Sequence, residues 1–293
     1  MGKTTNNLKT LVLMLAMMGL FLLVGAQFGR GGMLIALILG GVSNVIAWFF
    51  SDKIAIAAMQ GREVTHEDSG EALNLYALVD ELRTRAGLPM PRVYICPHDA
   101  PNAFATGRSP RKAAVAVTHG ALRLLSENEL RGVIGHELAH VKNRDTLTSC
   151  VAATIAGILA YIAQWGLWIG GGNNREGGNP LVAIVTFLLA GIGAALIKAM
   201  ISRSREFVAD ADGAAIAGDA SGLISALQKL EVYSQRIPLR QPNPAQNNLF
   251  IIEPLAGGSL VSLFATHPRT ELRIAALREV GAKLNAAREG RAV

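Results

Sequence analysis

Two long apolar runs near the N-terminus constrain the fold of this chain more strongly than any other feature. Residues 10–28 carry no charged side chain, and after Arg30 a second uncharged run covers residues 33–50. Each run is about long enough to cross a hydrocarbon core of ~30 Å as a helix. A cleaved signal peptide is the alternative for the first run, but a second span follows it in place of a cleavage site. We therefore expect a transmembrane hairpin in residues 1–50.

Composition agrees with insertion into a membrane. Hydrophobic residues make up 51% of the chain and charged residues 17%, whereas soluble domains carry about 25% charged residues. This composition argues against an ordinary cytosolic domain and against a disordered chain. Lys and Arg side chains that flank spans and face anionic lipid explain the net charge of +6. Only 5% of the residues are aromatic, which leaves few side chains on which nucleic-acid bases could stack. We therefore expect the lipid bilayer as a partner, and no nucleic acid.

A second pair of apolar runs covers residues 146–169 and 181–197, with a loop rich in Gly and Asn between them. These runs predict a second transmembrane hairpin in residues 146–201, and hence four transmembrane helices in the chain. A buried helical hairpin that does not fully cross is the alternative, because the runs are rich in Ala, Gly and Ile. Basic residues gather at the outer ends of both hairpins, so the positive-inside rule places both termini in the cytoplasm.

The two remaining segments, residues 51–145 and 202–293, predict one cytoplasmic α+β domain that the second hairpin divides. Short stretches at residues 92–96, 102–107 and 113–118 are typical of β-strands, with turn residues between them. Apolar residues at helical spacing lie on either side of these stretches. We therefore expect a small sheet that is bracketed by helices.

Two Ser/Thr-x-x-acid sequences, at residues 65–68 and 126–129, are typical of capping boxes that open helices. Gly87 is expected to end the first of these helices. Gly132 and Gly135 lie within the second, where each glycine costs about 1 kcal/mol relative to Ala. This cost predicts that another element approaches the second helix closely.

The second helix also carries the sequence His-Glu-Leu-Ala-His at residues 136–140. Side chains four residues apart lie on one face of a helix, about 5–6 Å apart at Cβ. His136 and His140 can therefore bind one zinc ion through neutral imidazole nitrogens. Glu137 lies beside them and can reach a water on the metal, as the chemistry of an HExxH motif requires.

A catalytic zinc site of this kind needs a third protein ligand. Glu206 and Asp210 follow the fourth apolar run and lie four residues apart, on one face of an expected helix. We expect Glu206 to be the third ligand and Asp210 to accept a hydrogen bond from a ligand imidazole, which fixes its tautomer. A solvated acidic helix face is the alternative for this pair.

These motifs occur in an order that resembles the M48 family of zinc metalloproteases. HELAH is followed by two apolar runs and by SREFVAD at residues 204–210, with NAFATG upstream at 102–107 and ATHP downstream at 265–268. The resemblance covers essentially the whole chain. It implies a gluzincin-type metalloprotease domain, made of helices with a small sheet, combined with transmembrane helices in a bacterial inner membrane.

The resemblance also implies roles for single residues. The family's motifs hold three zinc ligands, a catalytic glutamate, an aspartate that follows the third ligand, and a late histidine. In this chain they fall on His136, His140 and Glu206, on Glu137, on Asp210, and on His267. The implied substrate-binding edge strand contains Asn102, Ala103 and Phe104.

The expected reaction is hydrolysis of peptide bonds in unfolded polypeptides or damaged membrane proteins, with one zinc ion per chain. Glu137 would act as general base, and His267, at the entrance of a C-terminal helix, would help to stabilise the oxyanion. The apolar side of that helix is expected to contain Leu272, Ala275, Ala276 and Val280. The proline-rich stretch 237–258 is expected to form a long loop that covers the substrate. A protease that works inside the membrane is disfavoured because charged residues flank the motif helix. A non-enzymatic membrane protein or scaffold with an incidental HExxH stays open as the alternative.

Overall fold

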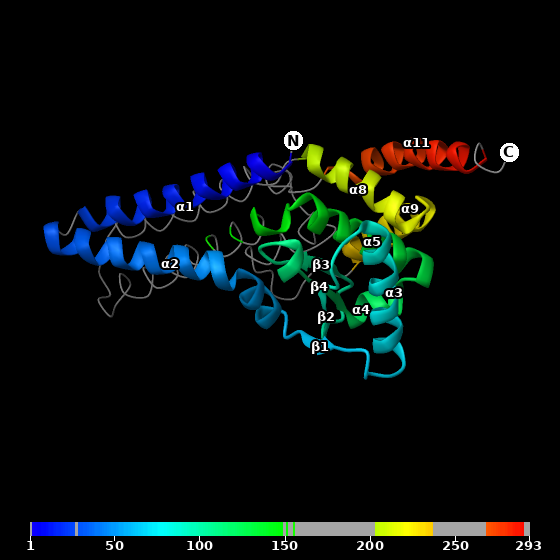
Figure 1. The fold of residues 1–293 in the computed structure, drawn as a ribbon, viewed down its shortest axis with the longest axis horizontal. Helices are drawn as coiled ribbons and strands as arrows, with labels where there is room; N and C mark the ends of the chain where they lie inside the picture. Colours follow the sequence, from blue (N-terminus) through cyan, green and yellow to red (C-terminus); the bar gives the residue numbers. More distant parts are fainter. Residues whose placement is uncertain are drawn as a thin grey trace.

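The computed structural model describes residues 2–26, 29–148, 151, 155, 203–236 and 268–289. Two long helices, α1 (Gly2–Ala26) and α2 (Gly29–Ala58), lie side by side as an arm that projects from the rest of the protein (Figure 1). Most of the large apolar side chains on α2 are exposed rather than packed inside the protein. Among the described residues, α2 is the one helix that is long and apolar enough to cross a membrane.

The described residues therefore support one of the four predicted spans by length and composition. Helix α1 contains a shorter apolar stretch, Thr10–Leu23. The second predicted hairpin lies outside the described residues, except for its first part. There, Leu147, Val151 and Ile155 pack against Met17 of α1 and Ala47 of α2. The start of the third apolar run thus lies against the N-terminal arm.

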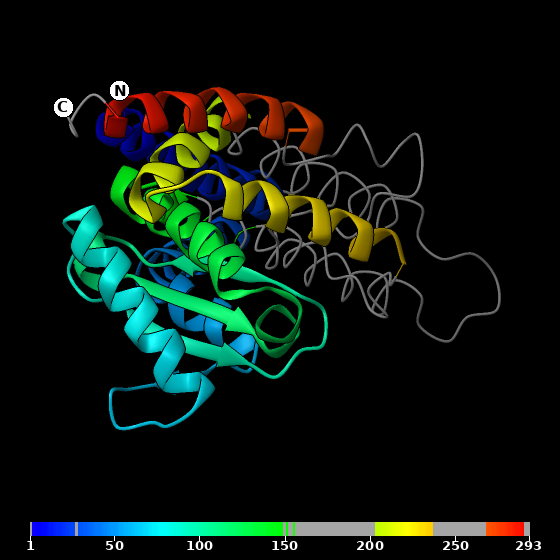
Figure 2. The same ribbon diagram turned by 90° about the vertical axis from the view of Figure 1, so that its right-hand side faces the viewer.

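The sheet has four strands in the order β1-β2-β4-β3, as labelled in Figure 1 and seen after a 90° turn in Figure 2. Strands β2 and β4 are parallel, and the two outer pairs are antiparallel. The strands are β1 (Arg62–Val64), β2 (Arg92–Cys96), β3 (Ala103–Thr106) and β4 (Ala114–Thr118). The three predicted strands are confirmed, whereas β1 was not predicted because three residues are too few to show an alternating pattern. Strand β3 is an edge of this sheet.

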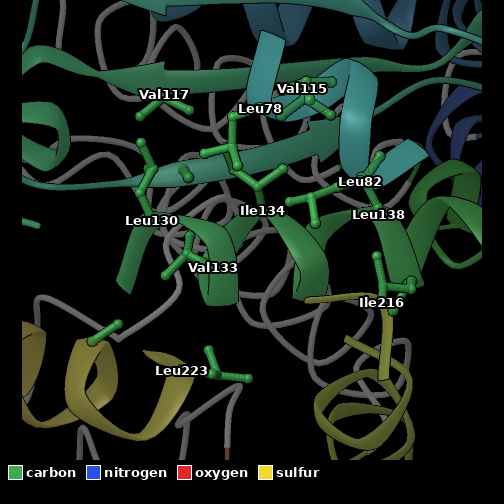
Figure 3. Packing of buried hydrophobic residues seen from close by; sticks show 14 of the residues in the cluster. Leu78, Leu82, Val115, Val117, Leu130, Val133, Ile134, Leu138, Ile216 and Leu223 are labelled. Carbon is green, nitrogen blue, oxygen red and sulfur yellow. The ribbon is translucent and has the colours of Figure 1, made fainter. Parts of the chain in front are cut away.

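Helices surround this sheet and give a helix-rich α+β protein. They are α3 (Glu71–Ala86), the short helices η1 (Pro110–Lys112) and α4 (His119–Leu124), then α5 (Glu127–Asn143), α8 (Arg203–Ala217), α9 (Ser221–Arg236) and α11 (Thr270–Glu289). Helix α5 lies at the centre, because one side packs on α3 and the sheet and the other side packs on α8 and α9. Figure 3 shows Ile134 of α5 beside Leu78 of α3 and Val115 of β4, and Val133 turned toward Leu223.

The first capping box was predicted wrongly. Helix α3 begins at Glu71, and Gly70 before it has a φ of 61° and makes no side-chain cap. Thr65 and Asp68 instead close a separate turn, in which the Thr65 N–H donates to Oδ2 of Asp68 at 2.9 Å. The carboxylate is used inside the turn and is not available to a helix. The predicted end of α3 is confirmed, because Gly87 adopts a left-handed φ of 69°.

The second capping box is confirmed and also joins two helices. Ser126 accepts from the backbone of Glu129, and the Glu129 carboxylate accepts from the Ser126 N–H at 2.8 Å. The same buried carboxylate accepts from Ser225 at 2.5 Å and from Lys229 at 2.7 Å. Burial disfavours the charged form of Glu129, but these hydrogen bonds outweigh it and hold its pKa at about 2. One carboxylate thus ties the start of α5 to α9.

The predicted close approach to α5 is also confirmed. A Cβ placed on Gly135 would lie 2.7 Å from the carbonyl oxygen of Gly213, and one on Gly213 would lie 2.7 Å from the His136 nitrogen. A Cβ on Gly132 would collide with the backbone of Leu223. Because no side chain separates α5 from α8, the helix that carries Glu206 lies directly against the HExxH motif.

The apolar face predicted for the C-terminal helix is confirmed only at Val280, which packs against the main core. The prediction used Leu272, Ala275, Ala276 and Val280, yet Leu272 is 57% exposed and Ala275 is exposed. The buried side chains of α11 are Thr270, Arg273, Ile274 and Leu277. An arginine on the inner face makes that face look polar in the sequence, so the apolar pattern indicated the wrong side.

Candidate metal centre and active site

Helices α5 and α8 bring three possible metal ligands together. Nε2 of His136 lies 3.2 Å from Nε2 of His140. The Glu206 carboxylate oxygens lie 3.8 Å from the first of these nitrogens and 3.6 Å from the second. One ligand atom from each residue lies within 4.8 Å of the others. Two imidazole nitrogens and one carboxylate oxygen are a donor set that fits zinc and leaves a coordination position open.

The candidate site is negative and largely closed to solvent. His136 and Glu206 are buried. Burial alone would lower the pKa of His140, but the hydrogen bond to Asp145 and the charges of Glu206 and Glu137 outweigh it and raise the pKa to about 9. Several carboxylates that converge on one imidazole favour a positive charge at their centre. This arrangement suits a bound cation.

Each candidate histidine ligand has a carboxylate on its second ring nitrogen. Nδ1 of His136 lies 2.9 Å from Oδ1 of Asp210, which is 1% exposed. Nδ1 of His140 lies 3.3 Å from Oδ2 of Asp145. These carboxylates leave both Nε2 atoms to face Glu206, which is the tautomer that metal binding through Nε2 requires.

Sequence reasoning did not find Asp145. This residue follows the end of α5, where Arg144 adopts a φ of 61° and the Asp145 N–H donates to the carbonyl of His140 at 3.0 Å. The left-handed turn brings the side chain back to the ring. An acid five residues after the second histidine is the sequence signal, but a helical projection places it on another face.

Arg273 is the second residue that sequence reasoning missed. Its Nε donates to Oδ2 of Asp210 at 2.8 Å, and its Nη2 donates to Oδ1 at 2.6 Å. Both residues are 1% exposed. Burial would raise the pKa of Asp210, but the Arg273 charge and hydrogen bonds, with His136, hold it at about 2. The guanidinium thus keeps the carboxylate beside His136 ionised.

Glu137 faces the edge of the sheet. Its Oε2 accepts a hydrogen bond from the backbone N–H of Ala105 at 2.8 Å, and its side chain is buried. Asn102 accepts from the backbone of Thr118, and Phe104 lies opposite Ala116 in the register. Alternate residues of an antiparallel strand turn their backbone groups away from the partner strand. The backbone groups of Ala103 and Ala105 therefore face the candidate site.

The predicted substrate-binding residues lie on or next to this edge. Ala103 and Phe104 are in β3, and Asn102 directly precedes it; all three are buried. His267 and the stretch 237–258 lie outside the described residues. Pro268, which follows His267, is buried at the start of the segment that leads into α11.

The family comparison covers this whole arrangement. The model for peptidase family M48 matches residues 69–281, a range that contains both histidines, Glu137, Glu206 and Asp210. The chain belongs to peptidase family M48. Membership confirms the resemblance that the motifs indicated and makes the chain a peptidase. The M48 match also includes the two residues that sequence reasoning missed, Asp145 and Arg273.

Relatives of this M48 peptidase are similar along almost their full length. A protein named Protease HtpX homolog from Desulforapulum autotrophicum is 50% identical over 280 residues, which are 93% of this chain and 89% of the relative. Another of the same name, from Nostoc punctiforme, is 46% identical over 286 residues, which are 95% and 98% of the two chains. The crystal structure of S. mikatae Ste24p aligns with 94% of this chain at 18% identity and a TM-score of 0.48, and this chain spans 66% of its length.

Proposed function

We propose that this chain is a membrane-bound zinc endopeptidase that hydrolyses unfolded segments of misfolded or damaged membrane proteins. The reaction would take place on the cytoplasmic side of the bacterial inner membrane, with both termini in the cytoplasm. One observation carries the proposal: the possible ligand atoms of His136, His140 and Glu206 converge within 4.8 Å, with Glu137 between them and an edge strand.

His136, His140 and Glu206 would hold the metal ion in this proposal. Asp210 and Asp145 orient the two imidazoles through the ring nitrogens that face away from Glu206. A zinc ion, when bound, would supply the Lewis acidity that polarises a scissile carbonyl and lowers the pKa of a water molecule, so that this water can lose a proton and attack the carbonyl.

Glu137 is the proposed general base. It takes a proton from the attacking water and passes it to the nitrogen of the leaving amine. The hydrogen bond from Ala105 fixes the orientation of its carboxylate at 2.8 Å from the strand backbone. His267 is the proposed donor to the oxyanion. Its contribution is testable by kcat, because loss of one such donor costs about 10²–10³ in rate.

Strand β3 is the proposed docking edge for the substrate. An extended peptide that adds to this edge would bond to the backbone groups of Ala103, beside Asn102 and Phe104. Recognition through main-chain hydrogen bonds depends little on the side chains of the substrate, so it suits a peptidase that accepts many unfolded sequences. It also excludes folded domains, whose backbone groups are already bonded.

The decisive experiment compares Glu137→Gln with Glu127→Gln in zinc-loaded protein purified in detergent. Glu127 lies on the same helix, but its side chain is 83% exposed. Wild type and Glu127→Gln should bind one zinc ion and cleave casein in a chelator-sensitive reaction. Glu137→Gln should keep the zinc ion and lose cleavage. Zinc-loaded wild type that cleaves neither casein nor any other unfolded substrate would instead favour the non-enzymatic membrane scaffold.

A further inference from the structure

The connection between β3 and β4 carries a group of exposed positive charges. Residues 107–112 read Gly-Arg-Ser-Pro-Arg-Lys, and Arg108, Arg111 and Lys112 are all exposed. From residue 100 to residue 126 the sequence contains no Asp or Glu. Within the described part of the chain, none of these three cations forms an ion pair with a carboxylate. Their charge is therefore not neutralised within this part of the chain.

This loop is held in one conformation. Gly107 has a φ of 122°, and a Cβ there would collide with the carbonyl oxygen of Lys112. The carbonyl of Gly107 accepts from the Thr146 hydroxyl at 2.8 Å, and the Lys112 N–H donates to Ser109 at 2.9 Å. A partner that binds the three cations does not first have to order them, which lowers the entropic cost of binding.

The loop reaches the C-terminal part of helix α2 through Arg108. The Arg108 guanidinium carbon lies 4.9 Å from the centre of the Phe49 ring, which is 50% exposed. The ring of Phe50, the next residue of α2, has its centre 5.6 Å from the Lys53 ammonium nitrogen. Lys and Arg side chains near the end of a span lie along apolar surface in this way while their charged groups reach the lipid headgroups.

The charges of α2 place that boundary along the helix. Arg30 and Asp52 bound its uncharged part and lie 22 residues apart, which is about 33 Å of helix and matches a ~30 Å hydrocarbon core. Phe49 lies less than one turn before Asp52, so Arg108 reaches the depth of the lipid phosphates. Asp52 is neutralised by Arg92 at 2.8 Å and does not cancel the positive charge.

We propose that Arg108, Arg111 and Lys112, together with Lys53, bind the phosphate groups of anionic phospholipids in the membrane leaflet next to β3. The proposal rests on the membrane insertion of α2 that the proposed function includes. Strand β3 runs directly into this loop at Gly107. Lipid binding therefore holds the strand that faces Glu137 at the bilayer surface, where an unfolded segment leaves the membrane.

The test measures lipid affinity rather than hydrolysis. Detergent-purified protein is titrated with phosphatidylglycerol or phosphatidylcholine, and the rise in thermal unfolding temperature gives an apparent Kd. Phosphatidylglycerol should stabilise wild type, and Arg111→Gln/Lys112→Gln should raise the Kd by about fivefold per charge, the effect of one Lys or Arg at an anionic surface. Arg111→Lys keeps the charge and should bind as wild type does.

Arg278→Gln/Lys283→Gln is the matched control, because it removes the same charge from exposed positions on α11, far from α2 (Figure 1). It should leave the Kd unchanged. Equal Kd values for the two double variants, or equal stabilisation by phosphatidylcholine, would overturn the proposal. Stabilisation by inorganic phosphate alone, lost in Arg111→Gln/Lys112→Gln, would assign the loop to a free anion and overturn the lipid site. Because thermal unfolding is the readout, the lipid-binding proposal can be tested even if the protein has no peptidase activity.

Discussion

Arg273 donates two hydrogen bonds to the carboxylate of Asp210, and both side chains are almost completely buried. The same carboxylate lies 2.9 Å from Nδ1 of His136. The C-terminal helix α11 is thereby connected to a candidate metal ligand on α5 through a single aspartate on α8. Three helices that are distant in the sequence meet at this carboxylate.

The buried pair gives the first prediction. Arg273→Met should lower the free energy of unfolding by about 3–5 kcal/mol, because it leaves the Asp210 charge buried without the guanidinium that neutralises it. The double variant Arg273→Met/Asp210→Asn should recover much of this loss, since it removes the unpaired charge. Denaturant unfolding in detergent measures both. A single variant as stable as wild type would show that water reaches Asp210.

The second prediction concerns Asp145. Asp145→Asn should weaken zinc binding by about 10–100-fold, because a carboxylate on the outer nitrogen of a metal-binding histidine orients the ring and raises its basicity. Competition with a chelator of known affinity measures the change. Asp99→Asn is the control, because the side chain of Asp99 is 92% exposed. Identical zinc affinities for the two variants would show that Asp145 does not orient His140.

The third prediction concerns Glu129 and pH. The pKa of Glu129 lies at about 2 in the folded protein, against an ordinary value of 4.5. Its charged form therefore stabilises the fold above about pH 4.5, and this contribution is lost as pH falls toward 2. Glu129→Gln should be less stable than wild type by about 1–3 kcal/mol near neutral pH.

The stability difference between wild type and Glu129→Gln should stay constant above about pH 5 and shrink between about pH 4.5 and 2. Measuring both proteins without metal removes the effect of ligand protonation on zinc binding. A difference that does not depend on pH over this range would contradict an ionised Glu129 in the fold.

The fourth prediction tests the helix contact behind the site. A Cβ on Gly213 would lie 2.7 Å from the Cα and N atoms of His136. Gly213→Ala should therefore push α8 away from α5, separate Glu206 from the histidines and lower zinc affinity. Gly281→Ala on α11 meets only the Cβ of Ala220, at 3.3 Å, and should leave zinc affinity unchanged. Metal binding compares the two variants, with helix content checked by circular dichroism.

Local geometry made much of the candidate site predictable. His136 and His140 share a helix face because of their spacing, and Glu206 and Asp210 share another for the same reason. The residues that were missed depend on tertiary structure. Asp145 reaches His140 through a left-handed turn, and Arg273 is buried as the ion-pair partner of Asp210, which lies on another helix.

In the fold, too, the features set by local sequence were predictable and those set by distant residues were not. The central strands and the Ser126 capping box were predictable, because their signals lie within a few neighbouring residues. The short strand β1 and the separate turn at Thr65 depend on neighbours that the local pattern does not contain. Most of the face of α11 was misassigned, because the buried side chain of Arg273 is an exception to the rule that charged side chains lie outside.

The bond between Arg273 and Asp210 has a consequence for the order in which the protein is made. Arg273 follows Asp210 by 63 residues, so the candidate metal ligands leave the ribosome well before the guanidinium that neutralises their supporting carboxylate. A nascent chain that has not yet produced α11 contains His136, His140 and Glu206, but burying Asp210 at that stage would leave its charge uncompensated. Completion of the chain and completion of the candidate metal centre are therefore coupled by one ion pair.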